Sequence, residues 1–376
     1  MTPRNALALS MLAAVVAFVF FSSRHAAPLT AAPVDIDASP LPSTFTATDK
    51  RIHYIGRFDL TGPDGPRCAW PMSSVEIRFH GTGANVVINE EGEDRYEVVV
   101  DGAPQAVLPV RDGRHVYSIA SNLPSANHTI SLIKRTEASF GRTQFVEVQL
   151  ASGDRLENAP RLARRRIEAI GDSITAALGN EGTSQAHATI DTENAYLSYG
   201  AIASRFLKAD YQCIAWSGKK LWPDNDMPSI AGLTLPRDDS TRWHDAEWRP
   251  DVIVINLGSN DFYPDNPDKK GWVNAAVAFV KTLRVDDPHA MIYLGLGPMM
   301  SDSDPPGHHA LATLRDYLQT VVNERRALGD KRIRLLEFQQ EDPVTGVGAD
   351  QHPNIKTHEE MAERLVAAIE ADLHWR

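Results

Sequence analysis

The sequence IEAIGDSIT, residues 167–175, decides the fold of the C-terminal half of the chain. Residues 167–170 form a short apolar run that predicts a strand, and Gly171, Asp172 and Ser173 follow it directly. A serine at such a strand-to-helix turn lies at the carboxyl edge of a sheet, where the N–H groups of the opening helix favour a developing negative charge. An ordinary helix N-cap is the alternative interpretation, because Asp and Ser are favoured at that position.

Downstream of this stretch, strand and helix patterns alternate. Apolar runs predict strands at residues 213–216, 251–257, 291–296 and 333–338, and helices are predicted at residues 193–208, 272–283, 310–328 and 357–374. Near-continuous apolar strands between helices are typical of a parallel sheet that is covered on both faces. We therefore predict a three-layer α/β/α domain over residues 167–376, with its ligand site at the carboxyl ends of the strands.

Upstream of it, apolar residues follow a period of two, as in half-buried strands. These residues are Val75, Ile77, Phe79, Val86, Ile88, Tyr96, Val98, Val100, Ile130, Leu132, Val146, Val148 and Leu150. Turn residues at 81–83, 101–102 and 112–113 separate the runs, and Asp-Gly favours tight hairpins. The pattern predicts a β-sandwich of jelly-roll type over residues 51–152, joined to the α/β domain by a linker at residues 153–166.

The length and charge of the chain limit its class. At 376 residues it exceeds what one hydrophobic core usually serves, which agrees with two domains. Its formal net charge of -11 argues against nucleic acid or an anionic membrane surface as a partner. The local basic cluster at residues 161–166 is interpreted as a solvated face of the linker. An uncharged or polar small substrate fits this composition better.

The first residues have the pattern of an export signal. Arg4 precedes an uncharged, largely apolar run over residues 6–21, and small residues follow as far as Ala32. This pattern predicts a signal peptide at residues 1–32, a tether at residues 33–50, and export to the periplasm or the outside of the cell. The alternative is an uncleaved N-terminal anchor that holds the protein at a membrane.

Three further segments place reactive residue types after strands or before helices. Gly218 ends the stretch Trp216-Ser217-Gly218, and its backbone can approach a ligand closely. Asn260, in GSND at residues 258–261, can donate its side-chain amide, and His352, in GADQHPN at residues 348–354, precedes the last helix. Each segment alone fits a turn or cap, but their order at strand ends predicts one common site.

In order and local context, these four blocks resemble the SGNH hydrolases over about residues 166–376. The resemblance implies a flavodoxin-like three-layer fold, with Ser173 as nucleophile and His352 as general base and acid. It also implies an oxyanion hole made by the backbone N–H groups of Ser173 and Gly218 and by the side chain of Asn260. These roles agree with what acyl transfer requires, which is a hydroxyl within hydrogen-bond reach of a base and hydrogen-bond donors where the oxyanion forms.

The β-domain, with Gly56-Arg57-Phe58 near its start, resembles that of carbohydrate esterase family 2. This resemblance implies hydrolysis of O-acetyl groups on xylan, mannan or related sugars, with the 6-O position of hexoses favoured. Two alternatives stay open. One is a lipase-like or thioesterase-like SGNH hydrolase for longer acyl chains, and the other is a secreted carbohydrate-binding protein without catalysis.

Two side chains near these blocks have open roles. Asp350 lies two residues before His352, whereas most SGNH hydrolases carry an acid three residues before it, where this chain has Ala349. Asp350 is a candidate for orienting the imidazole, but the spacing favours a Ser/His dyad whose ring is held by backbone carbonyls, as in some members of carbohydrate esterase family 2. Trp216 is a candidate for substrate binding, because an aromatic face suits a pyranose; core packing is its alternative.

No cofactor, metal ion or obligate protein partner is expected from the sequence, and the expected substrate is an acetylated carbohydrate. His308-His309 has no cysteine or carboxylate cluster at ligand spacing around it, so we interpret the pair as part of a solvated loop. Cys68 and Cys213 fall in different predicted domains. Their pairing is left open, because a free cysteine also packs well as a small buried apolar residue.

Overall fold

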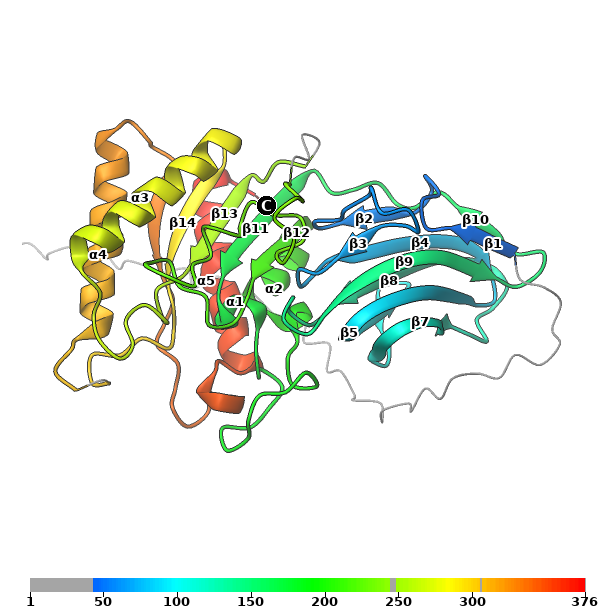
Figure 1. Ribbon diagram of the computed structural model, residues 1–376, viewed down its shortest axis with the longest axis horizontal. Helices are drawn as coiled ribbons and strands as arrows, with labels where there is room; N and C mark the ends of the chain where they lie inside the picture. Colours follow the sequence, from blue (N-terminus) through cyan, green and yellow to red (C-terminus); the bar gives the residue numbers. More distant parts are fainter. Residues whose placement is uncertain (1–42, 244–247, 305, 376) are drawn as a thin grey trace, which may run out of the picture.

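The computed structural model describes residues 43–243, 248–304 and 306–375, which form two domains lying side by side (Figure 1). The predicted signal peptide and most of the predicted tether lie outside these residues. Among the helices that are described, none combines the length and apolarity that crossing a bilayer requires.

The N-terminal domain is built from antiparallel strands around one apolar core. In chain order these strands are β1 (Ser43–Thr46), β2 (His53–Ile55), β3 (Arg67–Cys68), β4 (Ser74–Gly81), β5 (Ala84–Val100), β6 (Ala103–Pro104), β7 (Leu108–Ala120), β8 (Ala126–Lys134), β9 (Gly141–Leu150) and β10 (Arg155–Glu157). The long strand β5 is central to the sheet, because its first half pairs with β7 and β9 and its last residues pair with β8. Alternate side chains such as Ile77, Ile88 and Phe145 lie in the apolar core of the domain, as the period of two predicts.

One predicted turn of this domain is wrong. Asp112 and Gly113 lie inside β7 instead of between two strands. The register shifts there, since Glu90 pairs with Gly113 and Glu93 with Arg111, and Gly113 has a φ of 90°. Asp-Gly supplies positive φ equally well to a hairpin turn and to a β-bulge, so the sequence alone does not separate the two. Strand β10 also lies inside the stretch predicted as linker, where it pairs with β4.

The C-terminal domain is a parallel sheet between two layers of helices. Its elements are β11 (Arg165–Gly171), α1 (Ser173–Ala176), the 3-10 turn η1 (Ala195–Leu197), α2 (Tyr199–Leu207), β12 (Ala209–Ala215), β13 (Val252–Asn256), α3 (Lys269–Asp286), β14 (Met291–Leu296), α4 (Ala310–Ala327), β15 (Ile333–Glu337), the 3-10 turn η2 (Ala349–Gln351) and α5 (Ile355–Leu373). Strand order in the described sheet is β12-β11-β13-β14-β15. This 2-1-3-4-5 order is that of flavodoxin-like folds and confirms the predicted fold class.

The helices cover the sheet in the way that its apolar strands require. Helices α2 and α5 pack on one face through side chains such as Tyr199 and Leu365, and α3 and α4 pack on the other through Trp272 and Leu314 (Figure 1). Strand order reverses between β11 and β13, and such a switch point is where the fold places its ligands.

The two domains share buried side chains at the β12 edge of the parallel sheet. Trp70 of the β-domain is 1% exposed, belongs to the same buried apolar cluster as Ile214 of β12, and donates its indole N–H to the carbonyl of Leu233 at 3.1 Å. Arg57 and Glu168 form an ion pair across the same interface, with 3.0 Å between Nη2 and Oε2 and both side chains buried. Removing either partner of such a pair leaves an uncompensated buried charge, so a single substitution at Arg57 or Glu168 is expected to destabilise the interface. Cys68 and Cys213 are both buried free thiols and do not pair.

Candidate active site

Ser173 and His352 meet at the carboxyl edge of the parallel sheet. Ser173 is the first residue of α1 and is separated from the end of β11 by Asp172 alone, and its Oγ lies 2.8 Å from Nε2 of His352. Asp172 caps the helix, because its carboxylate accepts the N–H of Ile174 at 3.0 Å. The cap belongs to Asp172, so the hydroxyl of Ser173 is left to face the imidazole. The two residues are 179 positions apart in sequence and within hydrogen-bond distance in space.

The backbone around His352 fixes the orientation of its ring. Nδ1 of His352 donates to the carbonyl oxygen of Asp350 at 3.2 Å, which leaves Nε2 as the acceptor for the hydroxyl of Ser173. The loop is tied down by the N–H of Ala349, which donates to Gly179 at 2.9 Å, and by the N–H of Gly348, which donates to the carbonyl of His352 at 2.6 Å. Burial lowers the pKa of His352 below its ordinary value, although the carbonyls of Asp350 and Ala349 oppose this shift. The imidazole is therefore a neutral base at physiological pH.

The carboxylate of Asp350 points away from the imidazole. Its Oδ1 lies 2.8 Å from Nδ1 of His187, and its Oδ2 accepts the N–H of Ala188 at 2.8 Å. These hydrogen bonds hold the pKa of Asp350 below its usual range. Asp350 thus contacts His352 through its main chain, which is the dyad geometry that the spacing favours and not the orienting carboxylate of a triad. His187 gave no signal in the sequence, because its partner lies 163 residues away.

Two candidate oxyanion donors are unoccupied N–H groups. In the described part of the chain, the backbone N–H groups of Ser173 and Gly218 have no protein acceptor. Gly218 has a φ of 75°, and nothing lies within 4 Å of where a Cβ would stand, so there is open space on the Cα side of this residue. Nδ2 of Asn260 donates to the carbonyl of Lys219 at 3.0 Å and lies 3.4 Å from Oδ2 of Asp172. Both are hydrogen bonds, and the longer one, to Asp172, is the weaker, so its N–H is the one for which an oxyanion would compete.

Two buried aspartates hold these donors in place. Asp172 accepts a short hydrogen bond from Oγ of Ser259, which ties the end of β11 to the segment that carries Asn260. Asp261 accepts the N–H groups of Leu221 at 3.0 Å and Trp222 at 2.9 Å, and so ties that segment to the loop of Gly218. Burial raises the pKa of both carboxyl groups, and these hydrogen bonds oppose the shift. Both aspartates stand inside the quoted motifs, but the letters do not reveal which backbone groups they bind.

Trp216 lies beside the donor loop and is half-buried. It packs against Ala69, Ala138 and Leu235, and the side chains of Lys219 and Arg237 stand over its ring, 5.3 and 5.1 Å from the ring centroid. These contacts give Trp216 a packing role at the domain interface. A contact with substrate through the exposed part of the ring stays a prediction.

The remaining ionisable groups near the site do not form a metal site. Within residues 43–243, 248–304 and 306–375, no group of three or more His, Cys, Asp or Glu side chains is arranged to hold a metal ion. His358 is fully buried, and burial lowers its pKa to about 3, with neighbouring His352 adding to the shift. Its Nδ1 accepts the N–H of Tyr199 at 3.2 Å, so it serves as a neutral packing residue.

Comparison with known proteins identifies the family among serine hydrolases to which this chain is related. Residues 54–160 match the family described as Carbohydrate esterase 2 N-terminal, and residues 169–360 match the GDSL-like Lipase/Acylhydrolase family. A solved family two carbohydrate esterase from Clostridium thermocellum, in complex with cellohexaose, is 41% identical, with a TM-score of 0.82 over 86% of this chain and 100% of that chain. This chain belongs to carbohydrate esterase family 2. The resemblance inferred from the four motifs and the β-domain is thereby confirmed.

Two curated relatives extend the comparison within the family. Cellulase/esterase CelE of Acetivibrio thermocellus is 41% identical over 331 residues, which are 86% of this chain and 40% of CelE. The chain therefore spans less than half the length of that relative. An acetylxylan esterase / glucomannan deacetylase of Cellvibrio japonicus is 24% identical over 88% of this chain and 92% of its own length.

Proposed function

We propose that this member of carbohydrate esterase family 2 removes O-acetyl groups from polysaccharides of the xylan or mannan type, or from their oligosaccharides. The observation that carries the proposal is the 2.8 Å contact between Oγ of Ser173 and Nε2 of His352, at a sheet edge with unoccupied N–H groups. A serine with an adjacent base and preorganised donors is what acyl transfer to water requires.

In the proposed reaction, His352 takes the proton of Ser173 as its Oγ attacks the acetyl carbonyl. The negative charge that develops on the carbonyl oxygen is stabilised by the N–H groups of Ser173 and Gly218 and by the amide of Asn260. His352 then gives its proton to the departing sugar oxygen, which leaves as a hydroxyl, and an acetyl ester remains on Ser173. His352 deprotonates a water molecule that attacks this ester, and it then returns the proton to Oγ of Ser173 as the acetyl group departs as acetic acid, which ionises to acetate. The carbonyl of Asp350 keeps the ring in the required tautomer throughout.

The names of the relatives support an acetylated carbohydrate, over other esters, as the proposed substrate of this chain. The Cellvibrio japonicus protein is named for acetylxylan and glucomannan, and the Clostridium thermocellum structure holds a cellohexaose. The exposed part of Trp216, which is half-buried, is the surface proposed to contact a sugar ring. We also propose export through the predicted signal at residues 1–32, to be tested by fractionating cells and sequencing the N-terminus of the mature protein.

A chain-length series of p-nitrophenyl esters tests the acyl part of the proposal. An acetyl-specific site should lose its activity steeply beyond acetate, because longer chains must find space that the acetyl group does not need. Activity that rises with chain length would instead favour a lipase-like or thioesterase-like hydrolase. Affinity for polysaccharide without hydrolysis of any ester would favour the non-catalytic carbohydrate-binding alternative.

A further inference from the structure

Glu137 of the β-domain reaches into the loop that carries Gly218. It follows β8, is 3% exposed, and its Oε2 accepts both the N–H and the hydroxyl of Ser217 at 2.6 Å each. Ser217 directly precedes Gly218, whose N–H is a proposed oxyanion donor. A carboxylate from one domain therefore holds the residue next to the reacting centre of the other.

The turn around Ser217 explains why the hydrogen bonds of Glu137 to Ser217 affect the direction of the Gly218 N–H. The N–H of Lys219 donates to the carbonyl of Trp216 at 3.3 Å, and Gly218 has a φ of 75°, so residues 216–219 form a turn with the left-handed third residue of type II. Turns of types I and II differ mainly in the direction of the central peptide, which here contains the N–H of Gly218. Anchoring Ser217 on one side, and the carbonyl of Gly218 through Nδ2 of Asn225 at 2.9 Å on the other, fixes that direction.

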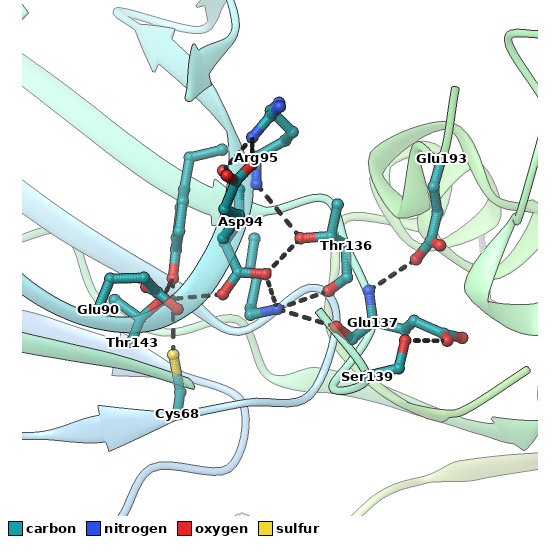
Figure 2. Close-up of polar contacts among 12 residues, drawn as sticks. Cys68, Glu90, Asp94, Arg95, Thr136, Glu137, Ser139, Thr143 and Glu193 are labelled. Carbon is teal, nitrogen blue, oxygen red and sulfur yellow. Dashed lines mark hydrogen bonds and ion pairs between the residues drawn. The ribbon is translucent and has the colours of Figure 1, made fainter. Parts of the chain in front are cut away.

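Glu137 is itself held by a buried polar cluster (Figure 2). Its backbone N–H donates to Oε1 of Glu193 at 2.6 Å, and its carboxylate accepts a short hydrogen bond from Ser139. Nζ of Lys134, which is fully buried, donates to Asp94 at 2.5 Å and to the carbonyls of Thr136 at 2.8 Å and Glu137 at 3.3 Å. The carboxylate thus has one defined position, set by residues of both domains.

We propose that Glu137 is a positioning residue for ester hydrolysis, which holds Ser217 so that the N–H of Gly218 points at the forming oxyanion. The β-domain is then part of the catalytic apparatus and not only a platform beside it. This inference rests on the proposed function, because it assigns the N–H of Gly218 to the oxyanion hole.

Substitutions of Glu137 can separate the effect of side-chain length from the effect of its charge. Glu137→Gln keeps the length of the side chain and one carbonyl oxygen, which can still accept both donors of Ser217, while its amide group faces the hydroxyl of Ser139. Glu137→Asp keeps the charge but is one methylene shorter, and Glu137→Ala removes both. Glu97→Gln is a matched control, since Glu97 is a buried carboxylate of the same domain that faces Arg135 at 3.4 Å without contacting Ser217.

The experiment measures kcat and KM for p-nitrophenyl acetate, with thermal unfolding of each full-length variant. We expect Glu137→Ala and Glu137→Asp to lower kcat by about 10- to 100-fold with KM within about threefold, somewhat less than the loss of a whole oxyanion donor. Glu137→Gln and Glu97→Gln should stay within about threefold of the wild-type kcat. Ser217→Ala, on the half-buried turn itself, removes one of the two hydrogen bonds without opening the buried cluster and should lower kcat by roughly three- to tenfold.

The inference is overturned if Glu137→Asp retains kcat while Glu137→Gln loses it, because charge and not position would then matter. It is equally overturned if Ser217→Ala leaves kcat unchanged, or if every variant changes only KM or the melting temperature while the wild type hydrolyses the ester. An inactive wild type, in contrast, overturns the proposed function and this inference together.

Discussion

Replacing Asp350 distinguishes a dyad from a triad in this site. In a triad, loss of the third member costs about 10⁴-fold in kcat, because the imidazole loses its tautomer and its partner. Here the carboxylate of Asp350 binds His187 and Ala188, and His352 is held by the carbonyl of Asp350, which any side chain leaves in place. The charge of Asp350 is also the weakest of the influences on the pKa of His352. We therefore expect Asp350→Ala and Asp350→Asn to lower kcat by less than about 30-fold.

The backbone at Asp350 predicts an order between the two variants. Asp350 has a φ of 49°, a left-handed conformation that asparagine tolerates well and alanine poorly. Asp350→Asn also keeps an oxygen for the N–H of Ala188, so it should be the milder change. Initial rates on p-nitrophenyl acetate measure the effect, and circular dichroism excludes misfolding. A loss of about 10³-fold or more in both variants would restore the carboxylate as a triad member and refute the dyad.

Further predictions follow from the base, the oxyanion donors and the chemistry. Activity should fall as the pH drops through the pKa of His352, because the protonated ring cannot accept the proton of Ser173. Burial lowers this pKa, so the midpoint of the pH profile of kcat/KM should lie below the ordinary histidine value. A midpoint above that value would contradict the assignment of His352 as the base. Asn260→Ala should lower kcat by about 10²- to 10³-fold with little change in KM, whereas a change confined to KM would make Asn260 a substrate-positioning residue. EDTA should leave the initial rate unchanged, and a loss that zinc restores would point to a metal-dependent deacetylase.

The parts of the fold that could be predicted from the sequence are those with a local cause. Apolar runs and periodicity placed the strand at Met291–Leu296 and the helix from Ala310 to within one residue of its end, because burial on both faces of a sheet leaves a clear pattern. The helix predicted from residue 193 begins only at Tyr199, after a 3-10 turn, since Glu193 is instead buried against Glu137 of the other domain. Such a tertiary contact has no periodic signature.

In the candidate site, too, features with a local cause could be predicted from the sequence, and contacts between distant segments could not. Ser173, Gly218, Asn260 and His352 each follow a strand or precede a helix, so the topology brings their segments to one edge of the sheet. The direction of the Asp350 carboxylate and the hold of Glu137 on Ser217 depend on contacts between segments 162 and 80 residues apart, respectively. Hydrogen-bond partners at such separations follow from the packed structure, and spacing within a motif does not encode them.

Acetate release from acetylated xylan and acetylated glucomannan, followed by position-resolved NMR, tests the central claim most directly. The account predicts that the wild-type protein releases acetate from at least one of these polysaccharides, and that Ser173→Ala, folded as judged by circular dichroism, loses nearly all of this activity. A Ser173→Ala variant that keeps more than about a tenth of the wild-type rate would contradict the nucleophile, and a wild-type protein that releases no acetate from either polysaccharide would contradict the substrate.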